Sequence, residues 1–442
     1  MLRMKLGQAL LIEDHRRLFR VVATAAFLNL LSGLLFILLV DHPVFDDKYN
    51  LPEAQRYAAE GISRDSIYRQ TVSPGPSSFI WIAEAINLFP GRDLEMARLA
   101  VAASWVLLAA GVLFLSSRSG DPGLWYVSFL CTLVFPHAAT ATAVVLTEGP
   151  ALLFCILGAL IWTQAQQSRL VSISSALQCV LGGLFLGLSI TCRQYYLTVL
   201  PAMMAVVFLE IRSRARVQDW RRIGTSVVSI FAAVLPVAVL YEIWKGLSSP
   251  ASMGIWRTTV RFNATRPVVA LFYVLLYLLP LTIIWVGRLR RKQFAIAAVS
   301  GIASAIALTP FRSMILQPGP LEAILHPALR FPSAHAVAFG CVTALLACNA
   351  TSVMYVLGAE RSKLLVSPLT VFATSCIVFF VIEQAGIGAG PGFFDRYILQ
   401  IIPFVAIVIF SARPELSRVQ IGALAAMWLL SQTMLWRYRF IV

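Results

Sequence analysis

Long apolar runs separated by short charged segments dominate this sequence and limit it to one class of fold. Each run holds roughly 17–24 mostly apolar residues, which is the length that a helix needs to cross a bilayer. About thirteen crossing helices are expected on this basis, over residues 21–40, 97–115, 124–143, 149–165, 171–190, 195–210, 223–244, 268–287, 294–310, 334–357, 366–384, 397–411 and 419–436. Charged residues make up only 13% of the chain, about half of their share in a soluble domain. We therefore expect an all-α polytopic membrane protein, with a single integral membrane domain over residues 1–442.

The distribution of charge predicts the orientation of these helices. If residues 1–20 are a cytoplasmic N-terminus, the segments on that side carry 20 Lys and Arg against 7 Asp and Glu, whereas the other side carries 16 against 14. Such an excess of basic residues is typical of cytoplasmic loops. The net charge of +15 therefore indicates loops anchored at a membrane surface and gives no reason to expect nucleic-acid binding.

Residues 77–90 form an apolar segment that is too short to cross and carries Glu84 in its middle. We expect this segment to be a helix that lies in the plane of the interface, within a long outer loop over residues 41–96. If it crossed the membrane, every later loop would change sides and the dense basic clusters would lie outside. The charge distribution therefore favours the in-plane helix.

Two adjacent carboxylates, Asp46 and Asp47, open the outer loop directly after the first crossing helix. A carboxylate in this position can deprotonate an acceptor hydroxyl or hold a metal ion. Alternatively, the pair is a solvated start of the loop that keeps the first helix from sliding into lipid. The residues alone leave both interpretations open.

Further polar groups are expected on the same outer side. Thr71 begins a segment with two prolines and a glycine, which predicts a rigid turn leading into the in-plane helix. Glu148 lies at the N-terminal end of a crossing helix, where the helix dipole favours an anion. Glu148 is therefore either a helix cap or a residue that faces the same cavity as the acidic pair.

Two arginines on the outer side are candidates for binding a phosphate group. Arg193, followed by Gln194, interrupts two apolar runs, and arginine offers a fork of donors that matches phosphate. The alternative is that Arg193 reaches out to lipid headgroups. Asp395 and Arg396 open a late crossing helix, where they either pair with each other or supply a second cation.

Several motifs are absent from the sequence. It contains no CxxC pair, no Walker A motif, no GxGxxG, no HExxH and no nucleophile elbow. A zinc site, a disulfide framework and chemistry driven by a bound nucleotide are therefore not expected.

Together these motifs resemble the GT-C class of membrane glycosyltransferases, and more narrowly the dolichyl-phosphate-glucose-dependent alpha-1,2-glucosyltransferase family. The Met-Asp-Glu-x-x-His-x-Pro-x-Ala-Gln-x-Tyr pattern of that family is matched by residues 45–57. Its Thr-x-x-Pro-Gly element is matched by 71–75, and its Tyr-Thr-Glu in part by 146–148. Its Arg-Gln-Thr-Asn is represented by 193–196, and its Asp-x-Arg-x-Tyr has a looser counterpart in 395–397.

The resemblance is strongest over residues 40–200, and the chain departs from the family pattern at some positions. Asp47 stands where the family has Glu, Asn50 stands where it has His, and Tyr195-Tyr196 replaces Thr-Asn. What the resemblance implies is a GT-C-like fold and a hexosyltransferase. The enzyme would move a hexose, with glucose as the expected sugar, from a polyprenyl-phosphate donor to a lipid-linked or glycan acceptor hydroxyl, with inversion, on the extracytoplasmic face.

The resemblance also implies roles for the candidate residues. Asp46 or Asp47 would act as the catalytic base. The substrate-binding residues would be Arg193, Gln194, Glu148, Arg396, Asp395, Gln55 and Thr71. A divalent cation such as Mg²⁺ or Mn²⁺ is compatible with this chemistry without being required by it.

The partners expected are a polyprenyl-phosphate-linked sugar donor, a glycan or lipid-linked acceptor and membrane lipids. The expected location is a bacterial inner membrane with the active site facing the periplasm. An endoplasmic reticulum membrane with a lumenal active site is the alternative. The rival function is a multispanning transporter or lipid flippase, in which the same charges would line a translocation path.

Overall fold

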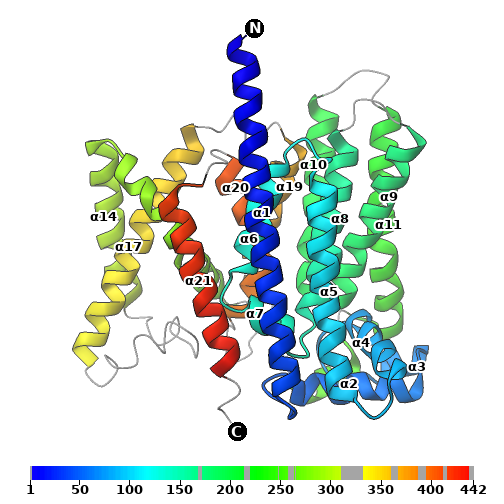
Figure 1. Cartoon of the computed structure of the whole chain (residues 1–442). Coiled ribbons are helices and arrows are strands. Elements are labelled where there is room, and N and C mark those ends of the chain that lie inside the picture. Colours follow the sequence, from blue (N-terminus) through cyan, green and yellow to red (C-terminus); the bar gives the residue numbers. More distant parts are fainter. Residues whose placement is uncertain are drawn as a thin grey trace.

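The computed structural model describes most of the chain and shows a bundle of helices (Figure 1). The described residues are 2–167, 172–213, 220–246, 248–256, 263, 265–309, 332–359, 367–386, 395–411 and 416–437. Every regular element in these residues is a helix. The prediction of an all-α fold is therefore confirmed.

The helices follow one another along the chain with short connections. The α-helices are α1 (Leu2–Leu39), α2 (Asp47–Glu60), α3 (Arg64–Tyr68), α4 (Pro76–Leu88), α5 (Asp93–Ser116), α6 (Pro122–Leu133), α7 (Ala138–Ala143), α8 (Glu148–Gln167), α9 (Ile173–Cys192), α10 (Val199–Ser213), α11 (Trp220–Trp244), α12 (Pro250–Trp256), α13 (Thr265–Thr282), α14 (Arg291–Leu308), α17 (Pro332–Ala359), α19 (Pro368–Gly386), α20 (Ile402–Ser411) and α21 (Arg418–Arg437). The 3-10 helices are η1 (Gln194–Thr198), η3 (Ile283–Arg288) and η5 (Asp395–Gln400).

Within the described residues, 10 helices are long and apolar enough to cross a membrane, and each overlaps one of the expected crossing helices. Three expected crossings take a different form. The segment 124–143 is divided into α6 and α7, because Pro136 lacks an N–H for a continuous helix. The segment 397–411 combines part of η5 with the short α20, and α14 starts with charged residues, Arg291 and Lys292.

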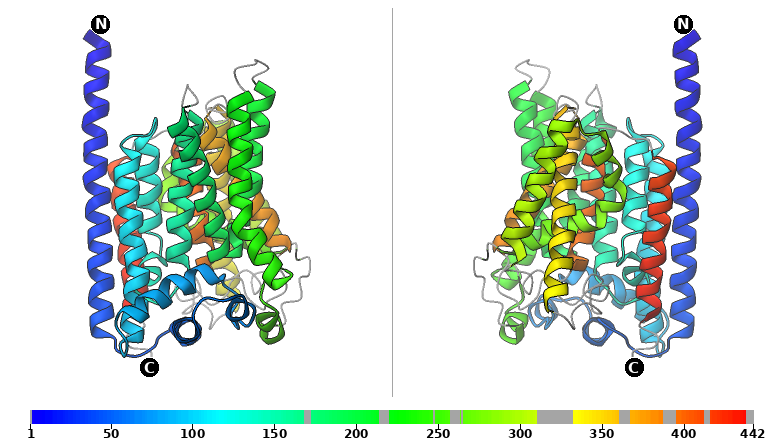
Figure 2. Two further views of the ribbon diagram at one scale, coloured as in Figure 1. Left: turned by 90° about the vertical axis from the view of Figure 1, so that its right-hand side faces the viewer. Right: turned by 90° about the vertical axis from the view of Figure 1, so that its left-hand side faces the viewer.

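The first helix is longer than expected. Helix α1 begins at Leu2 and has 38 residues, so residues that were expected to form a separate cytoplasmic segment continue the first crossing helix. At a rise of 1.5 Å per residue its length is about 57 Å. Its N-terminal part extends beyond the rest of the bundle (Figures 1 and 2).

Helices α2, α3 and α4 lie across the ends of the long helices at the lower end of the molecule in Figure 1, which is the end opposite the N-terminus (Figure 2). Helix α4 coincides with the helix expected over 77–90, and Pro76 occupies its first turn, where a proline is well tolerated. The outer loop is therefore a layer of short helices.

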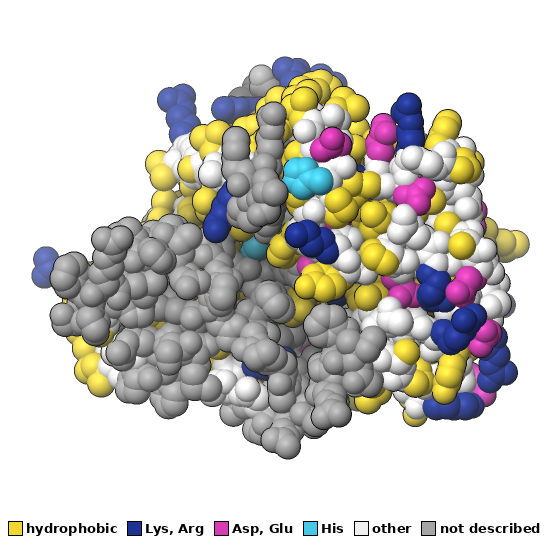
Figure 3. All heavy atoms as spheres, turned by 90° about the horizontal axis from the view of Figure 1, so that it is seen from below, with side chains coloured by type: hydrophobic (Ala, Val, Ile, Leu, Met, Phe, Trp, Pro, Cys, Tyr) yellow, Lys and Arg dark blue, Asp and Glu magenta, His cyan; other side chains and the backbone are white. Residues whose placement is uncertain are grey.

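The two ends of the bundle differ in charge. At the lower end, acidic and basic side chains are interspersed over the short helices (Figure 3), as in the ion pair of Arg69 with Asp65 at 2.7 Å. The other end carries basic residues at helix ends, where Arg222 of α11 pairs with Glu210 of α10 at 2.5 Å. The sequence predicts that the end rich in basic residues is the cytoplasmic one, and this orientation stays a prediction.

Small residues bring α9 close to α11. A Cβ added at Gly183 would lie 2.1 Å from the Ser229 carbonyl oxygen, and one added at Gly187 would lie 2.3 Å from that of Ala233. Such close backbone approach is a common way to pack helices in a membrane. The packing holds α9 along its length, and Arg193 follows directly after its last residue.

Candidate functional site

A buried ion pair joins the start of α2 to α5. Asp47 Oδ2 accepts hydrogen bonds from Arg98 Nη2 at 2.6 Å and from Arg98 Nε at 3.2 Å. The two side chains are 0% and 1% exposed. Arg98 also donates to the carbonyls of Val40 and His42, where α1 ends, so one guanidinium ties the end of α1 to the start of α2.

Both carboxylate oxygens of Asp47 are bound by groups of the protein. Its Oδ2 also accepts from the Val44 amide at 3.0 Å, and its Oδ1 accepts from the Val145 amide at 2.6 Å. The carboxylate therefore accepts from four N–H groups and lies away from solvent. Such an environment is typical of a carboxylate that holds structure together.

Asp46 has a different environment although it is the neighbouring residue. It stands at the N-cap position of α2, its side chain does not cap the helix, and it is partly buried. Phe45 has a φ of 48°, which is uncommon for a residue other than glycine and turns the chain sharply before α2. Of the two candidate bases, Asp46 is the one that borders solvent.

The segment between α7 and α8 is attached to α2. Asn50 Nδ2 donates to the Val145 carbonyl at 2.7 Å, while the Val145 amide donates to Asp47. Asp47 and Asn50 lie one turn apart on the same face of α2. Both backbone polar groups of Val145, its N–H and its carbonyl, are thus bound by side chains of this helix; we call these two groups the Val145 peptide.

A second buried ion pair joins Glu148, the first residue of α8, to Arg193 at the end of α9. Arg193 Nη2 donates to Glu148 Oε1, and the side chains of Arg193 and Glu148 are 7% and 9% exposed. The rings of Tyr195 and Tyr397 lie near the guanidinium, each with its centroid 5.9 Å from it. Arg193 is therefore held by a carboxylate and by aromatic rings that favour a cation.

The two ion pairs lie close together at the lower end of the bundle. Val145 and Glu148 are three residues apart, so their Cα atoms are separated by at most about 11 Å. Because Asp47 binds Val145 and Arg193 binds Glu148, the acidic pair and Arg193 are held near each other. The sequence predicts these groups at the same end of the protein.

The turn before α4 contacts the end of α9 next to Gln194, and it contacts α2 through Thr71. Gln194 Nε2 donates to the Ser73 carbonyl at 2.8 Å, and the Gly75 amide donates to the Cys192 carbonyl at 2.9 Å. Thr71 donates its amide and its hydroxyl to Glu53 Oε2 at 3.1 and 2.6 Å. The turn that carries Thr71 is therefore fixed to both α2 and α9.

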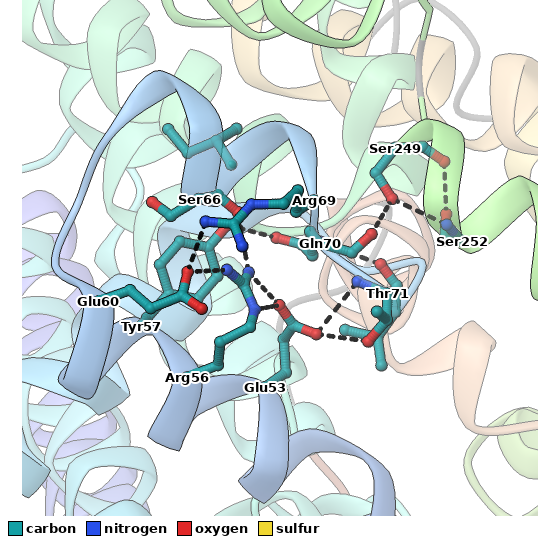
Figure 4. A network of polar contacts seen from close by, with 12 residues as sticks. Glu53, Arg56, Tyr57, Glu60, Ser66, Arg69, Gln70, Thr71, Ser249 and Ser252 are labelled. Carbon is teal, nitrogen blue, oxygen red and sulfur yellow. Dashed lines mark hydrogen bonds and ion pairs between the residues drawn. The ribbon is translucent and has the colours of Figure 1, made fainter.

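A network of polar contacts keeps α2, α3 and this turn together (Figure 4). Arg56 donates to Glu53 and Glu60, and its Nη2 reaches the Ser66 carbonyl at 2.8 Å. Burial alone would lower the pKa of Arg56, but the hydrogen bond and charge of Glu53 raise it overall. Burial raises the pKa of Tyr57, whose hydroxyl donates to Gln70 at 2.9 Å. Hydrogen bonds and ion pairs thus connect the short helices α2 and α3 to each other and to the turn.

The other predicted residues lie on α2 and η5. Gln55 Nε2 donates to Asp93 Oδ2 at 2.7 Å, so this side chain joins α2 to the first residue of α5. Asp395 and Arg396 belong to η5, but their side chains lie outside the described part of the structure. Their proposed roles stay predictions.

Arg98 and Glu53 of this region were missed from the sequence, and Asn50 was noted only as a departure from the family pattern. Arg98 offered a signal, because it stands at the start of the apolar run 97–115, and a charged residue in such a segment marks a buried partner. Glu53 is 3% exposed and Asn50 is 5% exposed. Residue type alone does not distinguish these two from solvated residues of a polar helix.

Within the described ranges, no three His, Cys, Asp or Glu side chains come together as metal ligands. Asp47, Glu53 and Glu148 each accept from N–H groups or hydroxyls of the protein. The use of a divalent cation stays a prediction.

Gly75 provides a test of the contact between the turn and α9. A Cβ at this position would lie 1.9 Å from the Thr191 carbonyl oxygen, so Gly75→Ala should push the turn away from α9. We expect a loss of about 1–3 kcal/mol in stability, measured as a lower thermal midpoint of the purified protein. Gly224→Ala in α11 is the matched control, because nothing lies within 4 Å of its Cβ position. Equal midpoints for the two variants would contradict the close contact.

No protein-family model and no curated protein matches this chain. Among solved structures, ArnT from Cupriavidus metallidurans bound to undecaprenyl phosphate has 16% identity, with 94% of this chain and 78% of that chain covered, at a TM-score of 0.45. The archaeal oligosaccharyltransferase AglB from Archaeoglobus fulgidus, in complex with an inhibitory peptide and a dolichol-phosphate, has 12% identity, 94% and 56% coverage, and a TM-score of 0.49.

Proposed function

We propose that this protein is a membrane glycosyltransferase that moves a hexose from a polyprenyl-phosphate donor to a hydroxyl of a glycan or lipid-linked acceptor. The observation that carries the proposal is that Asp46, which borders solvent, and the buried Arg193 lie at the same end of the helix bundle. One group suits an acceptor hydroxyl and the other suits a lipid phosphate.

The donor would be bound with its isoprenoid tail among the spanning helices and its phosphate at Arg193. An arginine has five N–H donors, so Arg193 can bind Glu148 and a phosphate oxygen at the same time. Glu148 would then keep the guanidinium oriented in the absence of donor. Arg396 is the proposed second cation, and Gln194 and Thr71 would contact the sugar or the acceptor.

The reaction would proceed by a single displacement. Asp46 takes the proton of the acceptor hydroxyl, the acceptor oxygen forms a bond to the anomeric carbon, and the bond from that carbon to the phosphate oxygen breaks. The electron pair leaves with the polyprenyl phosphate, whose negative charge Arg193 stabilises. Attack opposite the leaving group inverts the anomeric centre. No step of this proposal passes through a metal ion.

Glucose as the sugar and the extracytoplasmic face as the site of reaction are further parts of the proposal. Glucose rests on the motif resemblance over residues 45–57 and 71–75. The face rests on the excess of basic residues at the other end of the bundle. We propose a bacterial inner membrane with the site facing the periplasm, and an endoplasmic reticulum lumen as the alternative.

The direct test is a transfer assay with the full chain purified into lipid nanodiscs. Polyprenyl-phosphate-glucose is supplied with a panel of lipid-linked and free glycans, and donor consumption and product mass are followed. We expect release of polyprenyl phosphate together with an acceptor heavier by one hexose. The rival function predicts no consumption of donor in nanodiscs but movement of labelled donor between leaflets in proteoliposomes, and that combination would overturn the proposal.

A further inference from the structure

We infer that Asp47 and Asn50 form a clamp on the Val145 peptide, and that this clamp positions the catalytic carboxylate of Asp46 relative to Arg193. The inference deepens the proposed function and rests on it for its catalytic consequence. It assigns Asp47 and Asn50 as positioning residues, so the two adjacent carboxylates have separate tasks.

The buried segment between α7 and α8 needs hydrogen-bond partners from elsewhere in the protein. Residues 144–147 are not helical, and Val145 is fully buried. A buried peptide group without partners is costly, and irregular backbone inside a membrane protein persists only where the protein satisfies it. The side chains of Asp47 and Asn50 supply both partners, at 2.6 and 2.7 Å.

The second support is that the clamp is itself held in place. Asp47 is bound by Arg98, which also binds the carbonyls of Val40 and His42, just after the end of α1. The backbone amide of Asn50 donates to the Asp46 carbonyl at 2.9 Å. The clamp therefore connects α1, α2 and α5 to the Val145 peptide through buried contacts with little freedom.

The third support is the position of the clamp between the two reacting groups. Asp46 is the residue before Asp47, and their Cα atoms are about 3.8 Å apart. On the other side, Glu148 follows Val145 by three residues and binds Arg193. Within the described residues, two sets of contacts therefore connect Asp46 to Arg193 through Val145. They are the clamp and the ion pair of Glu148 with Arg193. A shift of the clamp would change the separation of Asp46 and Arg193.

Asn50→Leu tests the clamp without leaving a buried charge behind, because Leu has a similar size and no donor. We expect kcat to fall on the order of 10²-fold, since a misplacement of about 1 Å can cost that much, while the KM for donor changes little. Asn50→His should retain most of the activity, because an imidazole N–H is as many bonds from Cβ as the Asn amide and can donate to the same carbonyl.

The matched control is Asn349→Leu on α17. Asn349 is fully buried and donates to Thr282 at 2.6 Å, so the same substitution removes one buried hydrogen bond far along the chain from the clamp. We expect its kcat per folded molecule to equal that of the wild type. The inference is overturned if Asn50→Leu keeps wild-type kcat, or if Asn349→Leu loses as much activity as Asn50→Leu.

Hydrogen exchange gives a readout that does not depend on activity. The clamp predicts that the peptide containing Val145 exchanges faster in Asn50→Leu than in the wild type and in Asn349→Leu. If the wild type transfers no sugar but this exchange difference is present, the proposed function fails and the clamp stands. If the wild type is active and neither kcat nor exchange changes in Asn50→Leu, the clamp fails and the proposed function stands.

Discussion

Asp46→Asn is expected to abolish sugar transfer while the protein folds as the wild type does. The amide cannot accept the proton of the acceptor hydroxyl, and a positioned general base contributes about 10²–10⁴-fold to a rate. Asp46 is partly buried and does not cap α2, and Asn has the same shape as Asp, so the substitution introduces neither a cavity nor a clash. The measurement is kcat of the purified variant, together with its thermal midpoint.

A carboxylate in the same loop serves as control for this variant. Asp41 lies five residues earlier, and its side chain is fully exposed beside His42. Asp41→Asn removes the same charge from the same loop and should leave kcat unchanged. If Asp46→Asn transferred sugar at the wild-type rate, Asp46 would not be the base and the proposed mechanism would be wrong.

Asp47→Asn is expected to fail in a different way, through stability. The substitution leaves the charge of Arg98 buried without its carboxylate, and the amide nitrogen of Asn would face an N–H donor of either Arg98 or Val145. Breaking a buried ion pair on one side costs about 3–5 kcal/mol. We expect a large drop in the free energy of unfolding in mixed micelles and a lower yield of folded protein.

Two further variants make this result interpretable. Arg69→Gln breaks the surface ion pairs of an exposed arginine with Asp65 and Glu60, and it should change stability by no more than about 1 kcal/mol. The double variant Asp47→Leu with Arg98→Met should regain part of the stability that Asp47→Asn loses, because no unpaired charge remains. Wild-type stability of Asp47→Asn would show that the pair does not hold the ends of α1 and α2.

Much of the fold follows from properties of short stretches of sequence. The length of each apolar run predicted the crossing helices, and all ten of the crossing helices in the described residues overlap an expected one. The helix over 77–90 was predicted from its short length and from the charges around it, and α4 coincides with it. These features are local, because apolar length and charge are properties of one segment. Two of the three crossings that differ from the expectation also have local causes. Pro136 divides the segment 124–143, and α14 starts with charged residues.

The arrangement of the site depends on contacts between distant segments. Asp47 and Arg98 are 51 residues apart, Asp47 and Val145 are 98 apart, and Arg193 and Glu148 are 45 apart. In the sequence, Asp46 and Asp47 are two equal candidates. Packing distinguishes them, because burial and hydrogen-bond partners come from α5 and from the segment before α8. The residue types that carry charge could be read from the chain, whereas the different environments of Asp46 and Asp47 follow from which groups the fold brings against each one.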